Sequence, residues 1–225
     1  KMDQISQIVS EIEPLAPKDL MIRRMKFFAS FERARNSINY EADMAKVADN
    51  MGYLTSGEYA DSIFLFLDYQ YAAEYKKEMN DIPAAIEFYK KAVSRDEKKT
   101  GALAELAKLY RRNKQYNEAI ATFTEYMTKQ GDDKIKVADY LQLAQMYIPA
   151  ARQEGLTPEQ KQDYLNKGDE ALAKALEKDP TAYQAWLLRA QMSITDPRTA
   201  EEKPREYYEK ALEVMTTNEK GSDAN

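Results

Sequence analysis

The stretch YRRNKQYNEAIATF, residues 110–123, joins two segments whose apolar residues recur at helical spacing. The apolar residues of the first segment are Leu103, Leu106, Ala107 and Tyr110. Those of the second segment are Tyr116, Ala119, Ile120, Phe123, Tyr126 and Met127. The polar break between them, Arg112 to Gln115, is too short for any arrangement except antiparallel neighbours. The sequence therefore predicts a helical hairpin at this point of the chain.

The second half of this hairpin has a counterpart upstream. Residues 81–93, DIPAAIEFYKKAV, align with residues 115–127, QYNEAIATFTEYM, and this places Ala85 over Ala119 at a separation of 34 residues. A small side chain at such a position lets two helices cross closely, while larger residues one turn away fill the space. Related patterns follow in YLQLAQMY (140–147), GDEALAKALEKDP (168–180) and KPREYYEKALEV (203–214). The chain is therefore predicted to repeat one helical hairpin several times.

This repeating unit resembles the tetratricopeptide repeat, a 34-residue helix-turn-helix with an A-x3-F signature in its second helix. The signature residues of the best unit are Leu103, Leu106, Ala107, Tyr110, Ala119 and Phe123. The resemblance implies an all-α fold, a right-handed superhelical solenoid of antiparallel helix pairs. It also implies that the first helices of the pairs line a concave groove, which binds extended peptides or helices of partner proteins.

The resemblance divides the chain into three parts. Residues 65–217 are predicted to form an array of about four helix pairs, with an insertion near 148–161 between the two helices of one pair. Pro149 is expected to stop the helix before this insertion, and Thr157 to cap the longer helix after it. Residues 218–225 are read as a polar tail.

Residues 1–64 match the repeat loosely and are predicted to be a degenerate helical region. Amphipathic helices are expected over Pro17–Arg35 and Tyr40–Asn50. Residues 2–17 resemble a second helix without its first-helix partner, with Met2, Ile5, Val9 and Ile12 on one face. SIFLFLDYQY, residues 62–71, has the composition of a strand, but it stands where a first helix is due and is predicted to be helical.

On each first helix the stripe opposite the core should line the groove. The candidate groove residues are Gln70, Tyr71, Glu74, Lys77, Glu105, Lys108, Arg111, Leu141, Gln142, Gln145, Leu187, Leu188 and Gln191. The family's cationic clamp for carboxylates is not expected, because the matching positions hold Gln70, Glu74, Glu105, Ala138 and Gln142. Two interpretations stay open: a peptide-binding groove of mixed charge, amide and aliphatic character, or ordinary solvated helix faces.

Composition excludes several function classes. The absence of Cys and His removes thiolate nucleophiles, imidazole bases and the usual zinc sites. A net charge of −5 disfavours nucleic acid as a partner, and the Tyr residues that could stack on bases fall on predicted core positions. The longest apolar run, Ile63 to Leu67, falls far short of the roughly 20 residues that span a bilayer. We expect no enzymatic activity, no cofactor, no metal and no direct membrane insertion.

The leading functional hypothesis is a non-catalytic scaffold that binds a peptide or protein in the groove. The alternative is a structural component of a larger assembly, engaged through its ends or through the insertion around Arg152 to Thr157. Because neither end has a clearly polar outer face, we expect a fragment of a longer array or self-association through terminal helices. The inter-helix insertion and the repeat style resemble bacterial envelope proteins of this family, which implies the periplasm or cell envelope, although the cytoplasm stays open.

Overall fold

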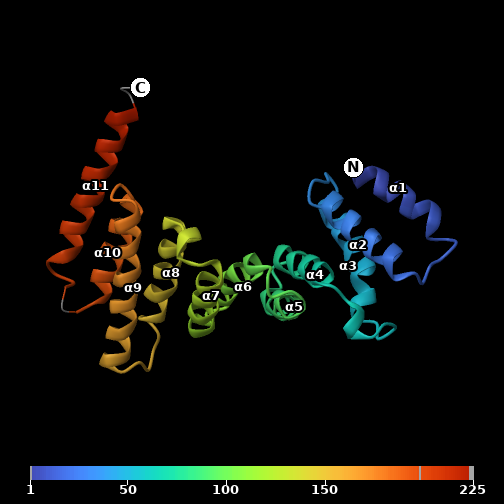
Figure 1. The fold of residues 1–225 in the computed structure, drawn as a ribbon, viewed down its shortest axis with the longest axis horizontal. Helices are drawn as coiled ribbons and strands as arrows, with labels where there is room; N and C mark the ends of the chain where they lie inside the picture. The colour runs from blue at the N-terminus through green and yellow to red at the C-terminus, as the bar shows by residue number, and fades with distance from the viewer. Residues whose placement is uncertain (1, 198, 223–225) are drawn as a thin grey trace. The chain divides into compact units, whose positions relative to one another are not determined.

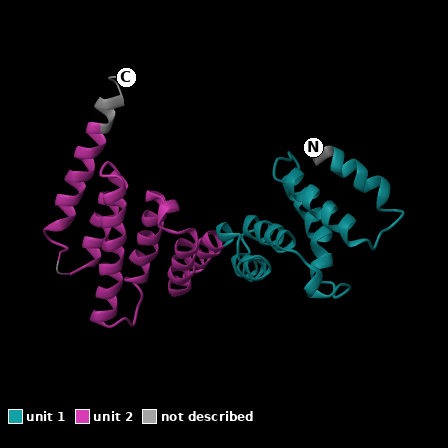
Figure 2. Ribbon diagram, viewed as in Figure 1, with its two compact units in different colours: residues 1–102 teal, residues 103–225 magenta. Residues whose placement is uncertain are grey.

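The computed structural model describes residues 2–197 and 199–222, with the side chains of residues 4–197 and 199–217. In these ranges the chain forms eleven α-helices and three short 3-10 helices, and it has no strand (Figure 1). The helices divide into two compact units, residues 1–102 and residues 103–225 (Figure 2). Within the described residues, no helix has the length and apolar character needed to cross a membrane.

Unit 1 contains five helices and the beginning of a sixth. These helices are α1 (Met2–Ile12), α2 (Leu20–Ala34), α3 (Tyr40–Met51), α4 (Phe66–Glu78) and α5 (Ile82–Arg95), followed by the start of α6 (Thr100–Arg112). Helix α1 packs on α2, α2 on α3, and α4 on α5, while α2 also touches α4. The helices expected near 17–35 and 40–50 are therefore present, and they pack against each other as a pair. The side chain of Met2 lies outside the described residues.

An aromatic core holds unit 1 together. Phe27 and Phe31 of α2 are fully buried, and each makes edge-to-face contacts with Tyr rings of other segments. Such ring pairs stabilise a core by about 0.5–1.5 kcal/mol beyond the burial of their area. The predicted helix in residues 62–71 is confirmed from Phe66 onward, where α4 begins. Residues Asp61–Ile63 form a 3-10 turn instead, and the carboxylate of Asp68 accepts the Leu65 backbone N–H at 2.7 Å.

Unit 2 continues α6 and adds five helices. These are α7 (Tyr116–Gln130), α8 (Val137–Ala150), α9 (Pro158–Lys178), α10 (Tyr183–Thr195) and α11 (Lys203–Ser222). The hairpin predicted around residues 110–123 is confirmed, because Ala107 of α6 and Ala119 and Phe123 of α7 are fully buried in one cluster. The helix pairs α8–α9 and α10–α11 pack side by side, and α10 also contacts α8. Lys114 closes the α6–α7 turn with a positive φ of 61°.

The insertion between α8 and α9 is a short loop. Helix α8 ends at Ala150, one residue beyond Pro149, and α9 begins at Pro158. Thr157 caps α9 as predicted, since its hydroxyl accepts the Gln160 backbone N–H at 3.2 Å. Helix α11 runs on to Ser222, so most of the segment read as a polar tail is helical. Residues 223–225 lie outside the described ranges.

Candidate partner-binding surfaces

The candidate groove residues all lie on α4, α6, α8 and α10, the first helices of four successive pairs. The four from Gln70 to Lys77 belong to unit 1, and the nine from Glu105 to Gln191 belong to unit 2. The structure therefore places them as two separate sets. Within unit 2, α8 and α10 contact each other, which brings their candidate residues onto neighbouring helices.

The candidates of unit 1 are largely engaged by their own unit. Tyr71 stacks on Phe28 of α2 with ring centroids 4.2 Å apart, and burial raises the pKa of its hydroxyl. Glu74 accepts a hydrogen bond from the Tyr89 hydroxyl and pairs with Lys77 at 2.6 Å. These side chains position α4 against its neighbours. Gln70 differs, because it lines a hollow in the surface.

The charged candidates of unit 2 lie on α6. Lys108 donates to Glu105 one turn earlier at 2.6 Å, so the two charges largely offset each other. Arg111 lies one turn further along the helix and is half-buried. This end of the candidate face therefore carries a small net positive charge.

The uncharged candidates of unit 2 divide by exposure. Gln145 and Gln191 are exposed on α8 and α10, and Leu141, Gln142 and Leu187 are half-buried. Leu188 is only 8% exposed and packs in the core cluster of α8, α9 and α10. Leu188 therefore serves packing, and its neighbour Leu187 remains on the accessible face.

A hollow of about 430 Å³ opens in unit 1 beside the start of α4, and we call it the apolar hollow. Its lining consists of Leu65, Phe66, Leu67, Gln70, Asp96, Lys99, Gly101 and Ala102. Leu65 and Leu67 are 55% and 49% exposed, and Ile63 nearby is 43% exposed. Contiguous exposed apolar side chains of this kind mark interaction surfaces on soluble proteins. The hollow adjoins Gln70, the one candidate residue that faces it.

The α3–α4 connection, residues 52–65, contributes Leu65 to the lining of the apolar hollow and is anchored by polar contacts. The Tyr59 hydroxyl donates to the Lys18 backbone oxygen at 2.6 Å, and Arg23 pairs with Glu58 at 3.0 Å. Asp61 accepts a hydrogen bond from Tyr69 at 2.5 Å, which lowers the pKa of that carboxyl. Burial, together with this hydrogen bond, raises the pKa of Tyr69 to about 12. The connection is thus held in a defined conformation in which Tyr53, Leu54 and Phe64 are buried while Ile63 and Leu65 face solvent.

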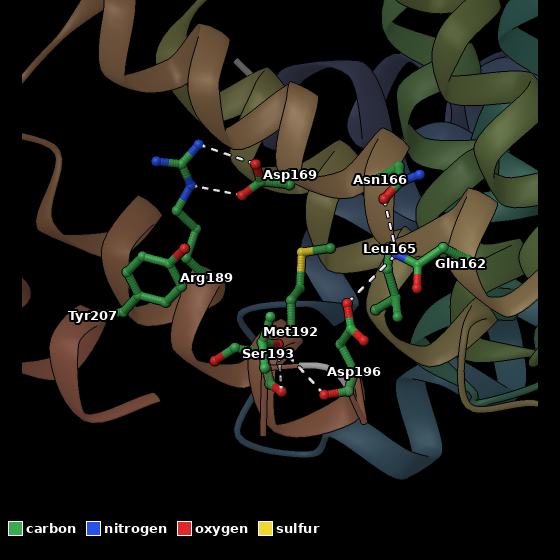
Figure 3. Close-up of a pocket in the computed structure, with 10 residues that line it drawn as sticks. Gln162, Leu165, Asn166, Asp169, Arg189, Met192, Ser193, Asp196 and Tyr207 are labelled. Carbon is green, nitrogen blue, oxygen red and sulfur yellow. Dashed lines mark hydrogen bonds and ion pairs between the residues drawn. The ribbon is translucent and has the colours of Figure 1, made fainter. Parts of the chain in front are cut away.

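A second pocket, of about 180 Å³, lies in unit 2 among α9, α10 and the segment leading into α11 (Figure 3). Arg189 pairs with Asp169 at 2.7 Å at one side, and Gln162 donates to Asp196 at 3.5 Å at the other. Met192 lies between these two pairs (Figure 3). Because Arg189, Asp169 and Asp196 all have polar partners within this pocket, we interpret it as a feature of helix packing.

Sequence reasoning missed the apolar hollow. The signal lies in residues 62–67, SIFLFL, whose apolar density fits a helix or a strand and does not by itself indicate a hollow. A second missed signal lies on α2, where exposed Met21 and half-buried Phe28 are seven residues apart on one face. Nothing in residues 1–64 alone indicates that α2 meets α4.

The comparisons with known proteins agree with this arrangement of helix pairs. The family model of the tetratricopeptide repeat matches residues 77–143, which span α5 to the first half of α8. Residues 77–143 carry the tetratricopeptide repeat. No curated protein gave a match to the repeat-containing chain.

Solved structures resemble this chain over most of its length. The C-terminal part of a repeat-containing protein from Cytophaga hutchinsonii is 19% identical, with a TM-score of 0.65, over 96% of this chain and 75% of that one. MamA from Desulfovibrio magneticus RS-1 is 14% identical, with a TM-score of 0.62, over 87% and 96%. A kinesin light chain from Podospora anserina is 12% identical, with a TM-score of 0.62, over 85% and 96%. The predicted fold class is confirmed.

Proposed function

We propose that this tetratricopeptide protein is a non-catalytic scaffold that binds a protein segment along the first-helix face of unit 2. One observation carries the proposal: α8 and α10 contact each other, and each keeps a long amide side chain, Gln145 and Gln191, exposed on its surface. Amide side chains can donate to and accept from the free backbone of an extended segment. Protein binding is also the activity typical of the repeat family.

The rest of this face suits the same role. Half-buried Leu141 and Leu187 offer apolar contact, and Lys108 and Arg111 add positive charge at the α6 end. An extended segment that places apolar residues near α10 and an acidic residue near α6 would match both properties. Because the apolar contacts lie near α10 and the positive charge lies near α6, the bound segment should run in one direction along the face.

Affinity capture from the source cell's lysate and envelope fraction tests the proposal. The bait is the full chain, compared with the triple variant Lys108→Glu, Gln145→Ala, Leu187→Ala. Gln145 is exposed, and Lys108 and Leu187 are half-buried. None of the three belongs to the core clusters of unit 2 described above, so the variant should keep its fold. We expect a protein that the parent captures and the variant loses.

A matched triple variant on second helices controls for general surface change. Lys174→Glu, Gln130→Ala and Leu212→Ala repeat the same three substitutions on α9, α7 and α11. This control should capture the same protein as the parent. If the control loses the protein and the first triple variant retains it, the second helices bind the partner and the proposal is wrong.

A structural role in a larger assembly is supported by a different observation. Both terminal helices expose apolar side chains, with Ile8 of α1 at 47% and Leu212 of α11 at 61%. Within a repeat array, each helix pair normally buries such apolar faces against the neighbouring pair. In that case the groove variant would assemble normally, and substitutions on α1 or α11 would not.

We also propose that the protein works in a bacterial envelope, on the ground that insertions between repeat helices resemble envelope members of the family. Cell fractionation with an antibody against the chain tests this location. Recovery only with cytosolic markers would refute it.

A further inference from the structure

The apolar hollow of unit 1 is shaped before any partner arrives. The α3–α4 connection is anchored at Lys18 by Tyr59 and at Arg23 by Glu58, and Arg95 of α5 donates to Asp61 at 2.5 Å. Leu65 and Leu67 are therefore fixed in exposed positions by contacts that do not involve their own side chains. A partner that binds there need not order the connection first, and such preorganisation favours binding.

The rim of the apolar hollow carries two lysines, which follow Asp96 and Glu97 in the same turn. Lys98 and Lys99 are consecutive exposed residues in the turn between α5 and α6, and Lys99 lines the hollow. The acidic residue in the lining, Asp96, already accepts the Lys98 backbone N–H at 3.0 Å. A surface with apolar side chains at its centre and two lysines at its edge fits a segment that carries aliphatic and acidic side chains on one face.

Helix α1 and the turn after it present such a face on the same chain. Ile8, Ile12 and Leu15 are 47%, 41% and 83% exposed, and they follow one another at helical spacing. Glu11 is exposed beside them. The adjacent flank of α1 is occupied, since Val9 is buried and Glu13 pairs with Lys26 of α2 at 2.6 Å. The packing on α2 leaves this aliphatic and acidic face free for a second molecule.

We propose that two copies of this chain associate, with the Ile8, Ile12 and Leu15 face of α1 from one copy seated in the apolar hollow of the other. Glu11 then approaches Lys98 and Lys99 at the rim. The two surfaces differ from each other, so the contact either closes reciprocally into a dimer or continues from copy to copy. This association uses unit 1 and is independent of the partner binding proposed for unit 2.

Sedimentation equilibrium of the full chain tests the association. Between about 10 µM and 1 mM protein, the range in which a small contact dissociates, the average mass should rise above that of one chain. Ile12→Glu on α1 and Gly101→Glu in the hollow should each weaken the association about tenfold or more, because each places a charge in an apolar contact. A Cβ atom at Gly101 meets nothing within 4 Å, so this variant should fold.

Matched variants separate the contact from general charge effects. Ser10→Glu on α1, an exposed position two residues from both Ile8 and Ile12 and so on another side of the helix, and Gly52→Glu at another open glycine add the same charge outside the proposed contact. Both variants should associate as the parent does. Exchanging the charges provides a second test. Glu11→Lys alone and Lys98→Glu with Lys99→Glu should each weaken association several-fold, and the combination should restore it.

A parent chain that sediments as one chain at every concentration overturns this proposal, as does association that Ile12→Glu and Gly101→Glu leave unchanged. The groove triple variant at Lys108, Gln145 and Leu187 should associate normally. If the groove variant still captures the partner, the proposal for unit 2 fails while the association can still hold. If the parent does not associate, the association proposal fails while partner capture can still hold.

Discussion

Arg24 of α2 and Asp68 of α4 form a buried ion pair in which the guanidinium Nε lies 2.7 Å and 2.8 Å from the two carboxylate oxygens. Asp68 is fully buried, and it also accepts the Tyr53 hydroxyl at 2.9 Å and the Leu65 backbone N–H. One carboxylate thus links α2, the α3–α4 connection and the start of α4. The position of Leu65 in the lining of the apolar hollow depends on that link.

Replacing Asp68 by Ala should destabilise unit 1 by about 3–5 kcal/mol, because Arg24 would remain buried without its partner. Urea unfolding followed by circular dichroism measures this change. Glu87→Ala is the control, since the Glu87–Lys90 pair is exposed and such pairs contribute about 0.5 kcal/mol or less. Equal losses in the two variants would show that the Asp68 pair is not buried in solution.

The pKa of Tyr69, raised to about 12 mainly by burial, predicts a loss of stability at alkaline pH. The unfolded chain ionises Tyr near pH 10, below the folded value, so the contribution is fully present below about pH 10. It is then lost as the pH rises through about 12, with an upper bound of about 3 kcal/mol. Urea midpoints measured from about pH 9 to about pH 12 should fall accordingly.

Tyr69→Phe isolates this contribution from other titrating groups. The variant should be less stable than the parent near neutral pH, because it loses the hydrogen bond to Asp61. Above about pH 10 its stability should fall less steeply than that of the parent. Parallel curves for the two proteins would refute the assignment of the raised pKa to Tyr69.

Gly168 of α9 allows both α8 and α10 to pack closely against α9. A Cβ atom at this position would lie 2.6 Å from Met192 Cε and 3.1 Å from Tyr147 Cβ. The Met192 tip can move, but Tyr147 Cβ is fixed to the backbone of α8, so Gly168→Ala should cost about 1–2 kcal/mol despite its better helix propensity. Gly101→Ala, where the new Cβ meets open space, should instead stabilise by up to about 1 kcal/mol. Thermal unfolding of both variants checks the opposite signs.

Arg152 fixes the loop between α8 and α9. Its Nε donates to the Thr195 hydroxyl at 2.9 Å and its Nη2 to the Gln191 backbone oxygen at 3.3 Å, both on α10. Arg152→Ala should speed amide hydrogen exchange in residues 151–157 and change global stability by about 1 kcal/mol or less. Lys161→Ala, a substitution in the first turn of α9, serves as the control. Unchanged exchange in the loop would mean that Arg152 does not restrain it.

The helical hairpins could be predicted from sequence because their determinants are close together in the chain. Ala107, Ala119 and Phe123 lie within one repeat length. Their spacing indicates the two helices, and the two Ala side chains indicate where these helices cross closely. The cap at Thr157 is likewise a local signal that spans four residues. Such local patterns can be recognised without knowing which helix packs against them.

The candidate face was predicted less completely, because its limits depend on how neighbouring helices cross. Leu187 and Leu188 are adjacent in sequence, yet the packing of α10 on α8 and α9 buries Leu188 in the core and leaves Leu187 half-buried. Tyr71 was expected in the groove, but it stacks on Phe28, which precedes it by 43 residues. A helical wheel gives directions around one helix and cannot give the angle to the next one.

The sequence by itself determined that this chain folds into tetratricopeptide-type helix pairs, since helical periodicity and small contact residues are encoded within each repeat. Only the tertiary structure decided that Leu65, Phe66 and Leu67 line a hollow. That outcome requires the Asp68 carboxylate to meet Arg24, which lies 44 residues earlier in the chain. Contacts between such distant residues leave no periodic signal, and they form only when the helices that carry them pack together.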